Sequence, residues 1–268
     1  MANINATAAV DPSAKLGPKV EIGPFCVIGP DVELGEGVVV HSHAVITGRT
    51  SLGAGCKVFP FACLGTAPQD VKYRDEPSTL TIGAKTIVRE HVTINTGTKG
   101  GHMATKVGAN CLLMIAAHVA HDCELGDNVT LVNGATLGGH VSIGDGAIVG
   151  GLSAVHQFVR IGAYAFIGGM SGITADVIPY GMAIGNRATL GGLNIVGLKR
   201  KGFPREQIHE LRQAYRLLFA SEGTLKERIE DVDGMFATNP LVKQIIEFIK
   251  IQSDRSFTVP NNAATPSR

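Results

Sequence analysis

Aliphatic residues recur at every sixth position through much of this chain. The longest early run is Val10, Leu16, Ile22, Ile28, Leu34, Val40, Ile46, Leu52, Val58 and Leu64. The register returns at 82, 88 and 94, runs unbroken from Val107 to Ile173, and returns again at 184, 190 and 196. A period of six matches neither the 3.6-residue helix nor the two-residue alternation of a strand. It predicts short strands joined by tight corners, with the aliphatic side chain inward and the glycine that often follows relieving the turn.

Hexapeptide repeats of this kind build a parallel β-helix. Three hexapeptides make one three-sided coil, and successive coils stack at the strand spacing of ~4.8 Å. We therefore expect a mainly β protein with a β-helix over residues 1–197. The repeat loses its aliphatic residues near 65–81 and its phase near 95–106, and both interruptions predict external loops, which are often functional.

The pattern changes to helical spacing from residue 198. Helices are predicted near 204–221, 224–234 and 239–252. Thr224 and Glu227 have the spacing of a capping box, and Asn239 precedes a proline that suits the first helical position. We expect an α-helical C-terminal domain over 198–268 that ends in a frayed tail from residue 254.

Composition narrows the class of protein. Aromatic residues are only 5% and tryptophan is absent, as suits a narrow core, and 44% hydrophobic residues argue against disorder. A net charge of +1 provides no overall field for nucleic acid. The chain shows no long apolar run, no leader-like N-terminus and no Cys-x-x-Cys pair among its five cysteines. We expect a cytoplasmic protein without a membrane span.

One corner of the predicted prism collects polar residues. One coil contains three hexapeptides, or 18 residues. When multiples of 18 are subtracted from the residue numbers, six polar residues fall within five positions of one coil: His118, His121, Asp122, His140, His156 and Gln157. His121, Gly139 and Gln157 form one column, and the cluster spans roughly 10 Å along the stack. Three interpretations are open at this point: general acid–base chemistry by a histidine, a zinc site held by three histidines, and a polar column of a purely structural prism.

Several motifs, taken with the prism, resemble the UDP-N-acetylglucosamine O-acyltransferase family, the first enzyme of lipid A synthesis, over nearly the whole chain. They are residues 69–73 (QDVKY), 117–123 (AHVAHDC), 138–140 (GGH), 154–158 (AVHQF) and 197–203 (GLKRKGF). The resemblance implies that the β-helix is left-handed. The residue spacing does not determine this handedness, which is opposite to the right-handed crossovers usual between parallel strands. The resemblance also implies a homotrimer with sites between prisms, and no cofactor or metal. The donor would be a 3-hydroxyacyl group on acyl carrier protein, and the acceptor the glucosamine 3-OH of UDP-N-acetylglucosamine.

The resemblance also assigns roles to residues. His121 matches the general base, Asp122 the residue that supports it, and Gly139 the backbone donor to the oxyanion. The matching binding residues are Asp70 and Lys72 for the sugar nucleotide, His118, His140, His156 and Gln157 near the sugar and acyl chain, and Asn194, Arg200 and Lys201 at the nucleotide end. The basic residues 199–201 and Arg205 also suit docking of the acidic carrier protein. Gly169 matches the gauge of acyl length, which predicts a chain of about fourteen carbons.

Three positions depart from the family pattern. Asn95 stands in place of a histidine, Val196 in place of a glutamate, and Lys201 in place of an arginine. Asn95 leaves open an acceptor with a 3-amino group. The competing hypotheses are a hexapeptide zinc carbonic anhydrase, a non-catalytic prism, and the later N-acyltransferase of the same pathway, against which the segment 197–200 argues.

Overall fold

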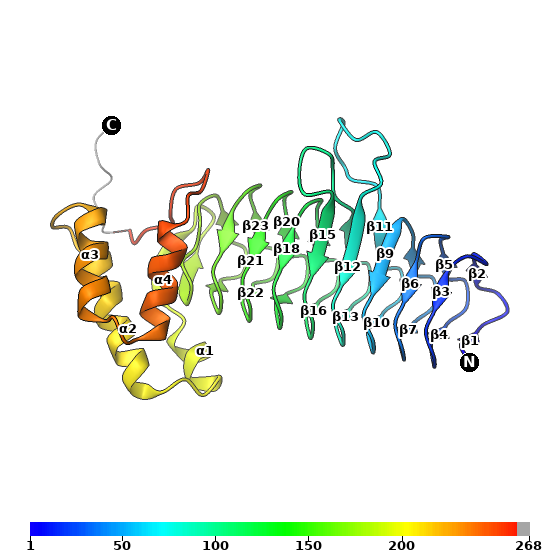
Figure 1. Cartoon of the computed structure of the whole chain (residues 1–268), viewed down its shortest axis with the longest axis horizontal. Coiled ribbons are helices and arrows are strands. Elements are labelled where there is room, and N and C mark those ends of the chain that lie inside the picture. Colours follow the sequence, from blue (N-terminus) through cyan, green and yellow to red (C-terminus); the bar gives the residue numbers. More distant parts are fainter. Residues whose placement is uncertain (262–268) are drawn as a thin grey trace.

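The chain folds into a three-sided prism with helices at one end (Figure 1). The computed structural model describes residues 1–261. Each turn of the chain contributes one short strand to each of three sheets, which we call sheets A, B and C. The coil is left-handed, as the family resemblance implies.

The strands are mostly two residues long and parallel. Sheet A contains, in spatial order, β1 (Asn3–Ile4), β4 (Glu21–Ile22), β7 (Val39–Val40), β10 (Lys57–Val58), β13 (Ile87–Val88), β16 (Leu112–Leu113), β19 (Thr130–Leu131), β22 (Ile148–Val149), β25 (Phe166–Ile167), β27 (Gly181–Ile184) and β28 (Thr189–Leu193). Sheet B contains β2 (Ala9–Val10), β5 (Val27–Ile28), β8 (Val45–Ile46), β11 (Cys63–Thr66), β14 (Thr93–Asn95), β17 (His118–Val119), β20 (Thr136–Leu137), β23 (Ala154–Val155) and β26 (Gly172–Ile173). Sheet C contains β3 (Lys15–Leu16), β6 (Glu33–Leu34), β9 (Arg49–Leu52), β12 (Thr79–Ile82), β15 (Ala104–Val107), β18 (Glu124–Leu125), β21 (Ser142–Ile143) and β24 (Arg160–Ile161).

The aliphatic repeat forms the core, as predicted. Side chains such as Leu64, Val119 and Ile167 are fully buried, and a smaller buried residue lies two positions before each of them. Four of the five cysteines are buried, and all four occupy this smaller position: Cys26, Cys56, Cys111 and Cys123. Burial raises the pKa of Cys123 to about 12, so this thiol stays protonated and serves as a small core residue.

The glycines of the repeat have a different role from the one predicted. The left-handed turn residues lie three positions after the aliphatic residue and are mostly not glycine, as at Phe25 (φ 57°) and His43 (φ 62°). Gly53 instead allows two coils to approach, because a Cβ there would lie 2.5 Å from the Ala84 nitrogen. These glycines therefore set the coil stacking rather than the turn.

The prism ends earlier than the repeat suggests. Ile184 is 46% exposed and Val196 is 61% exposed, so neither fills the core position predicted for it. After Ile173 the chain forms β27 and β28, which pair antiparallel and close the end of sheet A. This change of pairing ends the repeat, although the aliphatic spacing continues in the sequence.

Within residues 1–261 four helices follow: α1 (Ile195–Arg200), α2 (Arg205–Leu218), α3 (Leu225–Met235) and α4 (Pro240–Lys250). The last three agree with the predicted helices to within three residues, and both bonds of the Thr224–Glu227 capping box are present. Helix α1 was not predicted, and it begins inside the span 1–197 expected for the β-helix. None of the helices in residues 1–261 has the length and apolarity needed to cross a membrane.

The segment after α4 is not the frayed tail that the sequence predicted. Asp176 donates its main-chain N–H to the Ser256 carbonyl at 2.8 Å, and Leu190 donates to the Val259 carbonyl at 3.0 Å. The segment therefore pairs with the last turns of the prism. Residues 262–268 of the expected tail lie outside the described residues.

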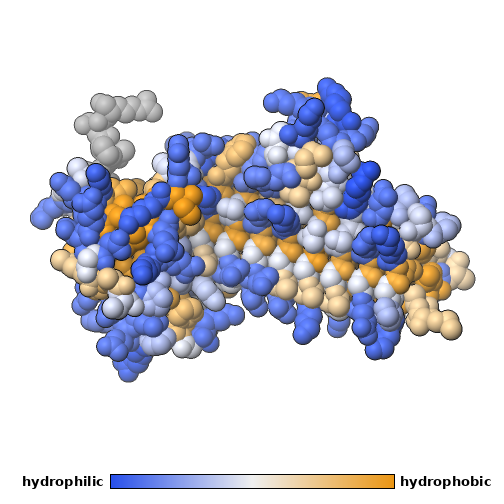
Figure 2. Space-filling view, in the orientation of Figure 1, coloured by the Kyte–Doolittle hydropathy of each residue, from blue (hydrophilic) through white to orange (hydrophobic). Residues whose placement is uncertain are grey.

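Two loops project from the prism side by side (Figure 1). They span 67–78, between β11 and β12, and 96–103, between β14 and β15, within the ranges predicted for external loops. The Ser78 hydroxyl donates to Thr96 Oγ1 at 2.9 Å, which joins their bases. Figure 2 shows polar residues over these loops and an apolar stripe along the prism face beside them.

Candidate active site

The predicted polar corner forms where sheet B turns into sheet C. His121 and Asp122 lie between β17 and β18, His140 lies one coil further between β20 and β21, and His156 one coil beyond that. His140 donates its main-chain N–H to the His121 carbonyl at 3.0 Å, and Phe158 donates to the Gly139 carbonyl at 3.1 Å. The arithmetic on the sequence therefore placed these residues in the correct stack.

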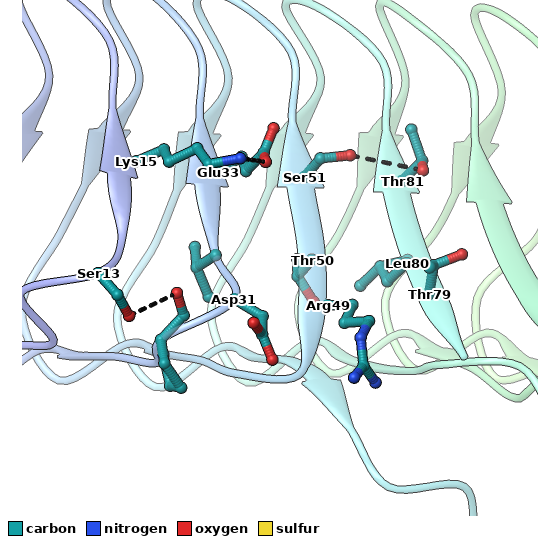
Figure 3. Close-up of a pocket in the computed structure, with 12 residues that line it drawn as sticks. Ser13, Lys15, Asp31, Glu33, Arg49, Thr50, Ser51, Thr79, Leu80 and Thr81 are labelled. Atoms are coloured by element: carbon teal, nitrogen blue, oxygen red, sulfur yellow. Dashed lines mark hydrogen bonds and ion pairs between the residues drawn. The ribbon is translucent and has the colours of Figure 1, made fainter. Parts of the chain in front are cut away.

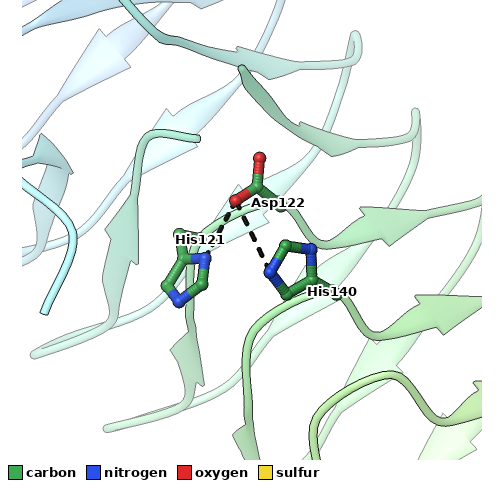
Figure 4. A group of neighbouring side chains, drawn as sticks. All are labelled: His121, Asp122 and His140. Atoms are coloured by element: carbon green, nitrogen blue, oxygen red, sulfur yellow. Dashed lines mark hydrogen bonds and ion pairs between the residues drawn. The ribbon is translucent and has the colours of Figure 1, made fainter. Parts of the chain in front are cut away.

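His121 and Asp122 form a hydrogen-bonded pair at the centre of this corner (Figure 4). His121 Nδ1 lies 2.9 Å from Asp122 Oδ2, and the Asp122 side chain is fully buried. Because an ionised carboxylate only accepts hydrogen bonds, Nδ1 carries the imidazole proton and Nε2 keeps its lone pair. His121 is therefore arranged to accept a proton at Nε2.

The second loop surrounds the Asp122 carboxylate with donors. Thr98 donates its hydroxyl to Oδ2 at 2.6 Å and its main-chain N–H at 3.1 Å, and the His102 N–H donates to Oδ1 at 2.9 Å. Burial by itself would raise the pKa of Asp122, but the hydrogen bonds from Thr98, His121 and His102 lower it overall. Gly101 lies against this group, since a Cβ there would be 2.3 Å from the Asp122 carboxyl carbon. The loop thus keeps Asp122 ionised and oriented.

Burial favours the neutral forms of the two neighbouring histidines. Burial lowers the pKa of His118, whose Nδ1 lies 2.7 Å from Thr93 Oγ1. Burial also lowers the pKa of His140, although the charge of Asp122 opposes that shift. The His140 ring packs edge-on against His121 at 5.0 Å and stacks on Phe158 at 4.4 Å.

Gly139 lies directly beside the His121 ring. A Cβ at this position would be 2.7 Å from His121 Nε2, so any side chain would fill the space next to the basic nitrogen. Within residues 1–261 the Gly139 N–H has no hydrogen-bond partner. The corner thus offers a free N–H donor next to a free imidazole lone pair.

The first loop brings an acidic residue to the same corner. The charge of Asp70 opposes the lowering of the His140 pKa, which is dominated by burial. Asp70 Oδ1 also accepts the Lys72 N–H at 2.9 Å, and Lys72 is exposed. His156 and Gln157 are partly exposed to solvent as well, and Arg255 contacts both of them.

The residues predicted for the nucleotide end lie along a different edge of the prism. Asn194, Arg200 and Lys201 line a pocket of about 460 Å³ together with Val196 and Tyr164. Asn194 caps α1 by accepting the Gly197 N–H at 3.0 Å, and it donates to the Tyr164 carbonyl at 3.0 Å. Tyr164 precedes β25, where sheet C turns into sheet A. One chain therefore does not bring this set together with His121.

Gly169 and Asn95 occupy two further positions singled out in the sequence. Gly169 is exposed where sheet A turns into sheet B, and the nearest atom to a Cβ there is the Gly151 carbonyl oxygen at 3.3 Å. A larger side chain at 169 would therefore project outward. Asn95 is buried, and its amide group donates to Thr66 Oγ1 and the Ala67 carbonyl, each at 3.0 Å.

The zinc hypothesis required three converging histidines. Within residues 1–261, the group with metal-ligand spacing is His121, Asp122 and His140, which supplies two imidazoles and one carboxylate (Figure 4). Asp122 Oδ2 and His121 Nδ1 already bond to each other. The arrangement fits an oriented base better than a three-histidine zinc site.

A separate shallow groove lies on sheet C near the N-terminal end (Figure 3). Its ion pair between Lys15 and Glu33 is exposed to solvent, and half of its remaining lining residues are serine or threonine. The groove contains no histidine or cysteine among its lining residues. We assign the chemistry to the corner around His121.

Sequence reasoning missed the residues that support this corner. The loop at 95–106 was expected to be functional, but its spacing gave no reason to single out Thr98 or His102. Their role depends on the loop folding back on Asp122. Arg255, which contacts His156, lies in the segment expected to be frayed.

Comparisons with known proteins agree with this architecture. A family profile described as "Udp N-acetylglucosamine O-acyltransferase; Domain 2" matches residues 176–258, and a bacterial transferase hexapeptide profile matches 13–48 and 104–139. The curated acyl-[acyl-carrier-protein]–UDP-N-acetylglucosamine O-acyltransferase of Rhizobium etli is 46% identical over 97% of this chain and 98% of its own length. The enzyme of the same name from Caulobacter vibrioides is 53% identical over 96% and 98%.

A solved structure gives the same result. The UDP-N-acetylglucosamine acyltransferase of Francisella novicida superposes with a TM-score of 0.93 at 34% identity, covering 99% of each chain. The match thus spans the prism, both loops and the C-terminal helices. This chain belongs to the UDP-N-acetylglucosamine O-acyltransferase family.

Proposed function

We propose that this chain transfers a 3-hydroxyacyl group from acyl carrier protein to the glucosamine 3-OH of UDP-N-acetylglucosamine, the first step of lipid A synthesis. The names of its relatives give an acyl carrier protein as donor and UDP-N-acetylglucosamine as acceptor, and the family resemblance adds the 3-hydroxyacyl group and the 3-OH. The observation that carries the proposal is the buried Asp122, which orients His121 and leaves Nε2 free. A sugar hydroxyl is a weak nucleophile until a base takes its proton, and this pair supplies that base.

The reaction proceeds by direct attack. His121 Nε2 removes the proton as the 3-oxygen attacks the thioester carbonyl, and the Gly139 N–H stabilises the oxyanion of the tetrahedral intermediate. When that intermediate collapses, the C–S bond breaks and the imidazolium returns the proton to the leaving thiolate of the carrier. Asp122 stabilises the transient imidazolium and fixes its ring. No acyl-enzyme forms along this route.

The remaining residues of the corner bind substrate. Asp70 and Lys72 hold the sugar nucleotide from the first loop, while His118, His140, His156 and Gln157 surround the sugar and the start of the acyl chain. Gly169, exposed where sheet A turns into sheet B, leaves space for the acyl chain, which we expect to have about fourteen carbons. Basic residues at 199–201 and Arg205 attract the acidic carrier protein.

The nucleotide end requires a second copy of the chain. Asn194, Arg200 and Lys201 line a pocket where sheet C turns into sheet A, whereas His121 lies where sheet B turns into sheet C. A sugar nucleotide that touches both sets must therefore lie between two prisms. This placement supports a homotrimer with three shared sites, working in the cytoplasm.

The test is acyl transfer by the purified protein from 3-hydroxyacyl carrier proteins of different length. UDP-N-acetylglucosamine and its 3-amino analogue are compared as acceptors at equal concentration. The proposal predicts ester formation on the hydroxy acceptor at a rate equal to or above amide formation. A preference for the amino acceptor would overturn the proposed acceptor, and transfer to neither would overturn the proposed reaction.

A further inference from the structure

The C-terminal segment 253–259 is tied to the last turns of the prism. Besides the bonds of Ser256 and Val259, Thr258 donates its main-chain N–H to the Asp176 carbonyl at 2.8 Å and its hydroxyl to the Ala175 carbonyl at 3.1 Å. Thr258 is buried, and the Phe257 ring lies 6.3 Å from that of Phe248 in α4. These contacts tie the segment to Ala175, Asp176 and Leu190.

This anchoring brings Arg255 to the active-site corner. Arg255 Nη2 lies 2.8 Å from His156 Nδ1, and Nε donates to the Gln157 carbonyl at 3.1 Å. Arg255 thus bridges one side chain and one main-chain group of the predicted binding residues. Arg255 and His156 are 99 residues apart in the sequence.

The geometry of this bridge determines the proton on His156. A guanidinium has only donors, so at 2.8 Å the Nδ1 of His156 accepts from Arg255. His156 Nδ1 also lies 3.2 Å from the Gln157 carbonyl oxygen, which only accepts. Nδ1 cannot donate to that oxygen while it accepts from Arg255. Instead, Arg255 donates to both acceptors as a fork, from Nη2 to His156 Nδ1 and from Nε to the Gln157 carbonyl oxygen. The imidazole proton therefore sits on Nε2.

We propose that Arg255 is a positioning residue that holds His156 as the Nε2–H tautomer, so that this imidazole donates a hydrogen bond to a substrate oxygen in the cleft. The inference rests on the proposed function for the presence of that substrate. Its structural part stands separately, because the tautomer is set by the protein alone. The fork also explains the need for arginine, since a lysine ammonium supplies one point charge and no fixed pair of donors.

The test uses the full-length protein with Arg255→Met and Arg255→Lys. Arg228→Met is the matched control, because Arg228 also donates from Nε and Nη1 to main-chain carbonyls, those of Leu218, Glu222 and Gly223, but has no contact with His156. Imidazole ¹⁵N shifts are measured on histidine-labelled protein, with His156 assigned from His156→Gln. Acyl-transfer kinetics are measured on each variant, and circular dichroism and thermal melts check the fold.

The wild type is expected to show His156 protonated on Nε2, and Arg255→Met to show a mixture of tautomers. The kcat/KM should fall about tenfold or more in Arg255→Met, as expected for loss of a hydrogen bond from a charged group, and stay unchanged in Arg228→Met. In the His156→Gln background, Arg255→Met should cause no further loss.

A wild-type His156 protonated on Nδ1, or a tautomer unaffected by Arg255→Met, would overturn the proposal. Equal losses from Arg255→Met with and without His156 would also overturn it, because they would mean that Arg255 acts elsewhere. Absence of transfer by the wild type would refute the proposed function instead, and the ¹⁵N shifts would still decide the tautomer.

Discussion

Replacing Thr98 with valine tests the support of the catalytic pair without touching either member. The substitution keeps the shape of the side chain and removes the hydroxyl that donates to Asp122 Oδ2 at 2.6 Å. The Asp122 carboxylate keeps the main-chain N–H groups of Thr98 and His102 and the His121 bond. A hydrogen bond to a charged group contributes about 1.5–3 kcal/mol, which sets the upper limit of the effect.

Only part of that energy reaches the transition state. Asp122 must stabilise the imidazolium that forms at His121. A carboxylate that has lost one hydrogen bond is held less firmly in line with the His121 Nδ1–H. We expect kcat to fall about tenfold, which corresponds to about 1.4 kcal/mol, with KM nearly unchanged. The assay is initial-rate acyl transfer at saturating UDP-N-acetylglucosamine, on protein whose melting transition stays cooperative.

Thr98→Ser is the matched control, because it retains the hydroxyl and loses only a methyl group. It should keep most of the wild-type kcat. The reasoning is refuted by a folded Thr98→Val enzyme with kcat within twofold of wild type, or by a Thr98→Ser enzyme that loses as much as the valine variant.

Three further predictions address pH, acyl length and assembly. The pKa of Asp122 is lowered in the folded protein, so the carboxylate stabilises the fold fully above its ordinary pKa of about 3.9 and loses this effect as pH falls through the lower folded value. The difference in unfolding free energy between the wild type and Asp122→Asn should therefore shrink below about pH 4. A difference that stays constant with pH contradicts this prediction. Gly169→Met, whose side chain projects outward, should move the optimal acyl donor to fewer carbons in a donor series, and an unchanged optimum argues against a length gauge at this position. Refolded mixtures of the His121→Ala and Arg200→Ala chains should regain activity that each variant lacks alone, because some shared sites then contain both intact residues. Mixed assemblies that stay inactive contradict a site built from two chains.

The sequence predicted the prism because one periodic signal determines it. Each inward aliphatic residue depends only on spacing, so Val119 and Leu125 could be placed without coordinates. The same arithmetic stacked His121, His140 and His156 at one corner. Spacing failed at Ile184, where antiparallel pairing of β27 and β28 replaces the repeat.

The supporting contacts of the site could not be predicted in this way. Thr98 meets Asp122 because a non-repeating loop folds back over the corner, and Arg255 meets His156 because buried Thr258 anchors the final segment. Both contacts depend on tertiary packing between segments that share no period. A polar, proline-containing stretch after the last helix resembles a loose tail when only its composition is considered.

The most direct test of the central claim is the rate of acyl transfer from 3-hydroxymyristoyl carrier protein to UDP-N-acetylglucosamine by His121→Ala beside the wild type. The account predicts a loss of about a hundredfold to ten-thousandfold, which is the contribution that general-base catalysis typically makes. The variant should retain the wild-type circular dichroism spectrum and oligomeric state. A folded His121→Ala enzyme that transfers the acyl group within tenfold of the wild-type rate would contradict the assignment of His121 as the base.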